Sequence, residues 1–205
     1  MKMHWSPRSP FVRKVMIAIH EMGIEEKVVC VRTVASPFRA HEDLMDDNPL
    51  SKLPTLVLDD GTVVYDSHVI CEYLDAQQNH ARLFPAAWQE RLIALRNEAL
   101  GDGLMDLGLL WLIERLRGEE LRSQDLVTAN ARKVERILDR LEVDVALLTD
   151  RTFDIGHLTI GTALGYLDFR FGFLNWRQGR PELAAWHADF LARPSVQANP
   201  VVDDS

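Results

Sequence analysis

The feature that most constrains the fold of this chain is a change in its pattern near residue 80. Before that point, short β-branched runs are separated by prolines, whereas after it apolar residues recur at helical spacing over long stretches. The chain has 205 residues, of which 47 % are hydrophobic, so it can bury a core in one large domain or two small ones. We therefore predict two domains, at residues 1–77 and 85–205, joined by a polar, turn-rich linker at Gln77–Pro85.

The first domain is predicted to alternate short strands and helices. Asp59-Asp60-Gly61 is a hairpin turn signal between two of the strands, and Ser67 is expected to cap the last helix. The expected elements, in chain order, are a strand at Met1–Trp5, a helix at Pro10–Met22, a buried strand at Lys27–Val31, a short helix at Arg39–Asp46, strands at Thr55–Leu58 and Thr62–Tyr65, and a helix from Ser67 to about Ala76.

This β-α-β-α-β-β-α order predicts a mixed four-stranded sheet. A strand, a helix and a strand early in the chain favour a parallel pair with a right-handed crossover, and the later hairpin adds antiparallel strands. With helices on its faces, such a sheet has the thioredoxin-like arrangement. The expected fold class is therefore an α/β thioredoxin-like domain followed by an all-α domain.

The second domain is predicted to be a helical bundle, because apolar residues repeat at helical spacing through most of it. Gly101 and Gly103 are expected to bend its first helix, and the tail Asn199–Ser205 is expected to be loose. The other expected segments are a helical continuation at Leu104–Arg117, an apolar stripe from Val134 to Leu148, a central helix at Thr159–Phe171 and a last helix at Pro181–Ala192.

Charge and cysteine content exclude several classes of protein. The formal net charge is −8, and no basic face for a nucleic acid is expected. Two cysteines are too few for a disulfide framework, which favours a reducing cytoplasm, and both Cys30 and Cys71 are expected to be inert core thiols. The longest apolar run, Leu107–Ile113, is too short to span a membrane, and no histidine pair has metal-ligand spacing. We therefore expect no nucleic-acid, membrane or metal partner.

A serine stands where the first strand meets the first helix, in Ser6-Pro7-Arg8-Ser9-Pro10. The N-terminus of a helix presents unpaired N–H groups and a positive potential, both of which favour an anion. Ser9 is therefore a candidate to bind an anionic ligand. Taken alone, however, the segment favours a simple N-cap serine ahead of a proline in the first helical turn.

A second segment, Asn48-Pro49-Leu50-Ser51-Lys52-Leu53-Pro54, leads into the third strand. We expect the Leu53–Pro54 peptide bond to be cis. In a thioredoxin-like sheet such a bond leaves the main chain of Leu53 unpaired, so that it can bond an extended peptide in β fashion. The alternative is a trans proline at a strand edge.

A third segment, Tyr65-Asp66-Ser67-His68, joins the end of a strand to the start of a helix. Asp66 could take an ammonium group, while Ser67 and the helix N-terminus take a carboxylate, so that the pair holds both ends of an amino acid. Taken alone, this segment favours an ordinary Asp-Ser helix cap.

Together and in this order, the three segments resemble the cytosolic glutathione transferase family. Ser-Pro-Phe-Val-Arg-Lys-Val, from Ser9, is similar to its serine-type bacterial and tau-like members. Asn48–Pro54 resembles the family's Asn-Pro-x-x-x-hydrophobic-Pro segment, and Asp66-Ser67 its acidic-Ser pair. In the helical half, Thr159 resembles the cap of the family's buried helix, with Thr162 in place of the usual aspartate.

This resemblance implies an enzyme that activates the thiol of glutathione, its co-substrate, as a thiolate for attack on a small electrophile. Ser9 is the implied thiol-activating residue, and Ser6 is the alternative. The residues implied to bind glutathione are Lys52, Leu53 and Pro54 at its glycyl and cysteinyl parts and Asp66 and Ser67 at its γ-glutamyl end, with smaller contributions from His41 and Arg39.

The resemblance also implies a cytoplasmic homodimer with an apolar acceptor pocket near Leu104–Trp111. Two other functions stay open. A glutathione-dependent thiol oxidoreductase would use a cysteine where this chain has Ser9, and the chain contains no Cys-x-x-Cys. A non-catalytic glutathione-binding or interaction protein could keep the fold, although the presence of all three segments argues against it.

Overall fold

In the computed structural model, residues 1–79 and 83–204 are described, and the chain divides into two compact units. The first unit comprises Met1–Arg91 with Pro194–Ser205, and the second comprises Leu92–Arg193. The segment Gln77–Pro85, predicted to be a linker, includes residues 80–82, which lie outside the described residues. Within the described part of the chain, no helix is long and apolar enough to cross a membrane.

The first unit contains the predicted βαβαββα order, and its mixed sheet confirms the thioredoxin-like fold. The strands lie in the order β2-β1-β3-β4, with β1 parallel to β2 and antiparallel to β3, and β3 antiparallel to β4. The elements are β1 (Lys2–Trp5), α1 (Pro10–Met22), a 3-10 turn (Glu25–Lys27), β2 (Val29–Arg32), α2 (Glu42–Asp47), β3 (Thr55–Val57), β4 (Val63–Val64) and α3 (Ser67–Ala76).

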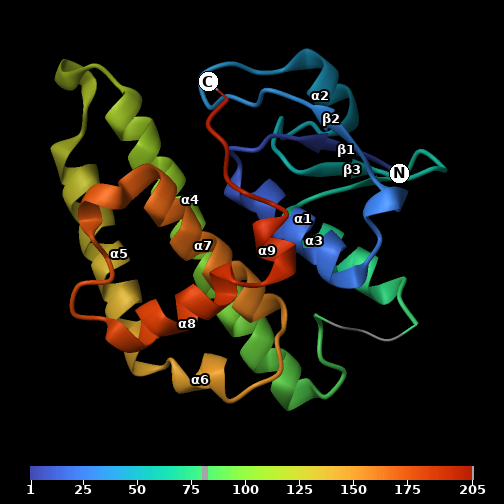
Figure 1. Cartoon of the computed structure of the whole chain (residues 1–205). Helices are drawn as coiled ribbons and strands as arrows, with labels where there is room; N and C mark the ends of the chain where they lie inside the picture. The colour runs from blue at the N-terminus through green and yellow to red at the C-terminus, as the bar shows by residue number, and fades with distance from the viewer. Residues whose placement is uncertain (80–82, 205) are drawn as a thin grey trace. The chain divides into compact units, whose positions relative to one another are not determined.

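The core of this unit lies between the sheet and two helices. α1 packs against α3 on one face of the sheet, and α2 lies on the other side (Figure 1). Met3, Leu56 and Ile70 are fully buried there. The short helix α9 (Pro194–Gln197) also packs against α1, and the Ser195 hydroxyl donates a hydrogen bond to Glu21 at 2.5 Å.

The second strand corrects the expectation of a buried strand at Lys27–Val31. β2 spans Val29–Arg32 and is exposed along its length, with 65 % of Val29 accessible to solvent. Cys30 is consequently exposed and is not the core thiol we expected, whereas Cys71 is buried as expected. The reason is the position of β2 at the edge of the sheet, where it has one neighbouring strand.

The second unit is helical, as predicted. Its central helix, α7, is buried from Ile155 through Leu167. α4 continues through Gly101 and Gly103 as one 29-residue helix, and a Cβ at Gly101 would lie 2.8 Å from the main chain of Thr159. The helices are α4 (Trp88–Leu116, which begins in the first unit), α5 (Gln124–Val143), α6 (Ala146–Thr149), α7 (Ile155–Phe171) and α8 (Pro181–Leu191), with 3-10 turns at Glu119–Leu121 and Gly172–Leu174.

Two helix boundaries in this unit differ from those expected. The apolar stripe from Val134 to Leu148 does not belong to one helix, because α5 ends at Val143 and α6 contains Leu148. α7 begins at Ile155, so Thr159 is not its cap. The Thr159 and Thr162 hydroxyls instead donate to main-chain carbonyls one turn back, at 2.7 and 2.8 Å.

The cap of α7 is formed by two residues that the sequence did not mark. The Asp154 carboxylate accepts hydrogen bonds from the main-chain N–H groups of Gly156 and His157, at 2.9 and 3.1 Å. In return, the His157 Nδ1 atom lies 3.1 Å from the main-chain nitrogen of Asp154 and 2.6 Å from its carboxylate. This reciprocal pair is a capping box in which histidine takes the place of the usual Glu or Gln.

The C-terminal tail, expected to be loose, makes long-range contacts within the first unit. The Arg13 guanidinium donates to the main-chain carbonyl of Asn199 at 2.8 Å, and Arg8 forms an ion pair with Asp204 at 2.9 Å. These contacts join residues far apart in the sequence, so no local pattern predicts them.

Candidate functional site

The register of the sheet brings three sequence segments to one edge of the first unit. His4 of β1 lies opposite Thr55 of β3, and Leu56 of β3 lies opposite Val64 of β4. Residues that follow β1, precede β3 and follow β4 must therefore lie together at one end of these three strands, which we call the β1–β3–β4 edge. These residues are the turn Ser6–Ser9, the pair Leu53–Pro54 and the pair Asp66–Ser67, which are the three segments singled out in the sequence.

Ser9 is the N-cap of α1. Its hydroxyl oxygen accepts a hydrogen bond from the main-chain N–H of Val12 at 3.3 Å, and its own N–H donates to the carbonyl of Ser6 at 3.3 Å. Because a hydroxyl has one donor hydrogen besides its acceptor lone pairs, this cap leaves the Ser9 proton available for another acceptor. Ser9 is half-buried, whereas Ser6 is only 7 % exposed.

The loop before β3 is ordered by Asn48, whose role the sequence analysis missed. The buried Asn48 amide donates to the Thr55 hydroxyl at 2.9 Å and to the carbonyl of Lys52 at 3.3 Å, and its oxygen accepts from the N–H of Leu50 at 3.0 Å. The Thr55 hydroxyl in turn donates to the carbonyl of Lys52 at 2.9 Å. A polar residue heading a proline-rich loop is the signal that could have predicted this role.

This network holds the last residues of the loop in place. The Leu53–Pro54 peptide bond is cis, Pro54 is buried, and the Lys52 side chain is exposed. Within residues 1–79 and 83–204, the main-chain N–H and C=O of Leu53 have no hydrogen-bond partner. They are therefore available to an extended peptide at this edge of the sheet.

Asp66, and not Ser67, is the N-cap of α3. The exposed Asp66 carboxylate accepts from the N–H of His68 at 3.1 Å, and the Tyr65–Asp66 bond is cis. Ser67 is the first residue of the helix and is 3 % exposed. The expected cap at Ser67 is therefore wrong by one residue. The segment still presents a carboxylate and a hydroxyl at a helix N-terminus, where the macrodipole adds positive potential.

The two lesser candidates flank the start of α2. The His41 ring accepts from the N–H of Leu44 at 3.2 Å and caps α2, which spans Glu42–Asp47 instead of the expected Arg39–Asp46. The main-chain N–H of His41 donates to the Ser51 hydroxyl at 3.2 Å, and this bond connects the cap to the loop before β3. Arg39 lies outside the helix and is exposed.

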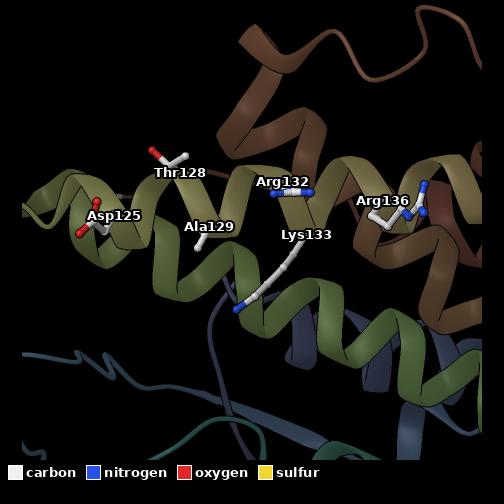
Figure 2. Close-up of a pocket in the computed structure, with 6 residues that line it drawn as sticks. All are labelled: Asp125, Thr128, Ala129, Arg132, Lys133 and Arg136. Carbon is white, nitrogen blue, oxygen red and sulfur yellow. The ribbon is translucent and has the colours of Figure 1, made fainter.

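A hollow of about 470 Å³ lies on α5 in the second unit. All of its lining residues come from this one helix, and Lys133 points away from Thr128 (Figure 2). A single helix cannot enclose a ligand, so the hollow lacks the concave walls of a small-molecule site. Its charged residues Arg132, Lys133 and Arg136 lie on the solvent-facing side of α5, as expected for a solvated helix surface. Its lining residues are Asp125, Thr128, Ala129, Arg132, Lys133 and Arg136.

The segment expected to line an acceptor pocket, Leu104–Trp111, is buried at some positions and exposed at others, with Leu110 48 % exposed. Leu104 is 1 % exposed and Trp111 is 4 % exposed, with the Trp111 ring packed 5.0 Å from the ring of Phe171. Trp111 is therefore a core residue in this unit. Among the described residues, no group of three or more His, Cys, Asp or Glu side chains is placed to hold a metal ion.

Comparison with protein families decides the relationship. Residues 8–77 match the glutathione S-transferase N-terminal domain, and residues 124–189 match the glutathione S-transferase C-terminal domain. This chain belongs to the glutathione S-transferase family. The N-terminal match contains all the residues implied to bind glutathione and Ser9, and the C-terminal match contains α5 and α7.

Members of this family that resemble the chain over nearly its whole length are known. The uncharacterized GST-like protein YibF of Escherichia coli is 35 % identical over 95 % of this chain and 96 % of its own length. A glutathione transferase family member from Pseudomonas fluorescens Pf-5, solved with bound glutathione, is 40 % identical with a TM-score of 0.95, over 98 % of this chain and 99 % of its own. A second structure from that organism, with bound S-(propanoic acid)-glutathione, is 39 % identical with a TM-score of 0.90, over 98 % of this chain and 100 % of its own.

Proposed function

We propose that this protein is a glutathione transferase that binds glutathione along the β1–β3–β4 edge of its first unit and activates the thiol with Ser9. The observation that carries the proposal is the convergence of the Ser9 turn, the unpaired main chain of Leu53 and the Asp66–Ser67 helix start at that edge. The bound glutathione of the Pseudomonas fluorescens structures supports a ligand of this kind.

In this proposal each of the three segments binds a part of glutathione whose chemistry complements its own. The main chain of Leu53 pairs with the cysteinyl part, Asp66 takes the γ-glutamyl ammonium, and Ser67 with the start of α3 takes its carboxylate. Lys52 lies beside Leu53 and meets the glycyl end, with smaller contributions from His41 and Arg39 before α2. No metal takes part in this scheme.

The chemistry is the attack of a thiolate on a small electrophile. A thiol with a pKa near 8.5 is mostly protonated at neutral pH, whereas the thiolate is the nucleophile. A hydrogen bond donated by the Ser9 hydroxyl to sulfur stabilises the thiolate, and the N-terminus of α1 adds positive potential. Ser6 is the alternative donor, three residues earlier in the same turn.

The function is tested by measuring glutathione binding by calorimetry and conjugation with aryl halides, enals, epoxides and peroxides. Binding together with turnover of at least one electrophile supports the proposal. Binding without turnover would identify a non-catalytic glutathione-binding protein, and rapid reduction of mixed disulfides would identify a thiol oxidoreductase. Either result would replace the proposed function.

Replacing Lys52 by methionine should weaken glutathione binding by about two- to fivefold. The side chain is exposed, and exposed ion pairs contribute only about 0–1 kcal/mol. Titration calorimetry measures the change, with Lys133→Met on α5 as the control for loss of one positive charge. An unchanged affinity in Lys52→Met would mean that Lys52 is an ordinary loop lysine.

Replacing Asp66 by asparagine should raise the KM for glutathione by about three- to tenfold while changing saturated turnover far less. Asparagine still accepts the hydrogen bond from the N–H of His68, so α3 stays capped while the negative charge is lost. The contact proposed for Asp66 lies at the γ-glutamyl end, away from the reacting sulfur, so it acts on binding. Steady-state kinetics with varied glutathione separates the two effects, and a loss confined to kcat would contradict this role.

We also propose a cytoplasmic homodimer, in keeping with the family resemblance. Trp88 and Leu92, one turn apart on α4, are 62 % and 52 % exposed, and such apolar patches commonly mark association surfaces. Trp88→Glu should therefore shift the mass measured by light scattering at micromolar concentration toward the monomer. Leu121→Glu places the same charge at another exposed apolar residue and should leave the mass unchanged. A monomeric wild-type protein would refute the dimer.

A further inference from the structure

Two arginines of the first unit converge on one carboxylate of the C-terminal tail. The Arg8 guanidinium contacts one oxygen of Asp204 at 2.9 Å. Arg32 contacts the other oxygen through two nitrogens, at 2.7 and 2.5 Å. The side chains of Arg8, Arg32 and Asp204 are only 27 %, 34 % and 28 % exposed, respectively, so the cluster is partly shielded from water.

Both arginines lie where two parallel strands end at the same place. Trp5, the last residue of β1, lies opposite Arg32, the last residue of β2. Arg8 lies in the turn that follows β1 and immediately precedes Ser9. The pair therefore lies at the carboxyl ends of β1 and β2, by the turn that carries the proposed thiol-activating residue. This is the end of parallel strands at which α/β sheets bind their ligands.

The arrangement is suited to a carboxylate. Guanidinium groups present several N–H donors in a fixed plane, and they bind carboxylate oxygens with short, charge-assisted hydrogen bonds. Here two guanidinium groups take different oxygens of the same carboxylate. The tail that supplies it is held upstream by the hydrogen bond from Arg13 to the carbonyl of Asn199, five residues before Asp204.

We propose that Arg8 and Arg32 form a binding site for a carboxylate on the second substrate, and that Asp204 occupies this site as an internal competitor. The inference rests on the proposed function, because the site lies beside Ser9 and acts on what reacts there. It assigns the substrate class as small electrophiles that carry a carboxylate. With an α,β-unsaturated acid, the glutathione sulfur bonds to the β-carbon, the C=C π electrons move to the α-carbon, and that carbon takes a proton from water.

The test compares two glutathione conjugates that differ in one group. S-(2-carboxyethyl)glutathione and S-(2-carbamoylethyl)glutathione are the adducts of acrylate and acrylamide, so the first carries a carboxylate where the second carries a neutral amide. The measured quantity is the selectivity, defined as the Kd of the amide divided by the Kd of the acid, from titration calorimetry. The variants are Asp204→Asn, which removes the competing charge, and Arg32→Gln, which removes one of the two cations.

We expect Asp204→Asn to raise the selectivity by about three- to tenfold and Arg32→Gln to lower it by a similar factor. Asp189→Asn, on an exposed carboxylate of α8, controls for the change in net charge. A selectivity within about twofold of the wild type in Asp204→Asn, or an equal rise in Asp189→Asn, would overturn the proposal and leave Asp204 as a structural anchor of the tail. If the wild type binds neither conjugate nor glutathione, the proposed function itself fails and this inference fails with it.

Discussion

Replacing Ser9 by alanine should lower kcat/KM for glutathione conjugation by about ten- to a thousandfold, because loss of one donor that stabilises a developing or bound anion has effects of up to about 10²–10³ in rate. Glutathione affinity should change little, since the Leu53, Lys52 and Asp66 contacts proposed above do not involve this hydroxyl. The midpoint of the pH–rate profile should rise, because the thiolate of bound glutathione loses a hydrogen bond that favours it over the thiol.

The cap that Ser9 forms on α1 supplies the competing explanation. Removing a serine N-cap costs about 1 kcal/mol of stability and has no reason to move a pH–rate profile. Unfolding in guanidinium and the pH dependence of kcat/KM, measured on the same variant, therefore separate the two roles. Normal turnover with an unshifted profile would reduce Ser9 to a cap, and Ser6→Ala would then be the variant expected to lose activity.

The parts of the site that could be predicted are those encoded by local segments. Ser9 and Asp66 each lie where a strand gives way to a helix, and a capping residue beside a proline or a hydroxyl marks such a position in one dimension. Their convergence follows from the observed sheet, in which the register of three neighbouring strands is enough to bring them to one edge. The one-residue error at Ser67 reflects two adjacent residues that are both good caps.

The errors arose where different structures share one local pattern. The apolar residues of β2 are typical of central and edge strands alike, and only the sheet order shows that Val29 and Cys30 face solvent. Thr159 resembles a helix cap, but a threonine inside a helix can satisfy its hydroxyl on the carbonyl one turn back, as it does here.

Contacts between distant parts of the chain left no local signal at all. Asp204 pairs with Arg8 and Arg32 across more than 170 residues, and the tail that carries it is polar in sequence and was expected to be loose. Asn48 organises its own loop through a buried network, although its position at the head of a proline-rich segment was visible. Charge and polarity identify which residues can pair, whereas the fold decides which of them do.

The cap of α7 is a place outside the site where a single polar substitution should cost much stability. Asp154 is 2 % exposed and contacts two main-chain N–H groups, the His157 ring at 2.6 Å and the Arg151 guanidinium at 3.2 Å. Burial opposes ionisation of this carboxyl, but the hydrogen bonds and charge interaction from His157, with a hydrogen bond from Arg151, hold its pKa below the usual value. The His157 ring is itself fixed by donating to the carbonyl of Leu148 at 2.8 Å.

Asp154→Ala should therefore lower the free energy of unfolding by about 2–4 kcal/mol at pH 7, because it removes a cap and leaves buried N–H groups and the His157 ring without their partner. Asp154→Asn keeps an oxygen acceptor and should cost about half as much. Ser123→Ala removes the exposed cap of α5 and should cost about 0.5–1 kcal/mol, which makes it the matched control.

The stabilisation of the folded protein by the Asp154 carboxylate should depend on pH. Because its pKa is lower in the folded protein than in the unfolded chain, Asp154 contributes its full stabilisation above the unfolded value, near pH 4, and loses it as the pH falls toward the folded value. The difference in stability between wild type and Asp154→Ala, measured by guanidinium unfolding, should stay constant from pH 7 to pH 5 and shrink below about pH 4. A difference that is small at pH 7, or that grows on acidification, would show that the Asp154 charge does not hold the start of α7.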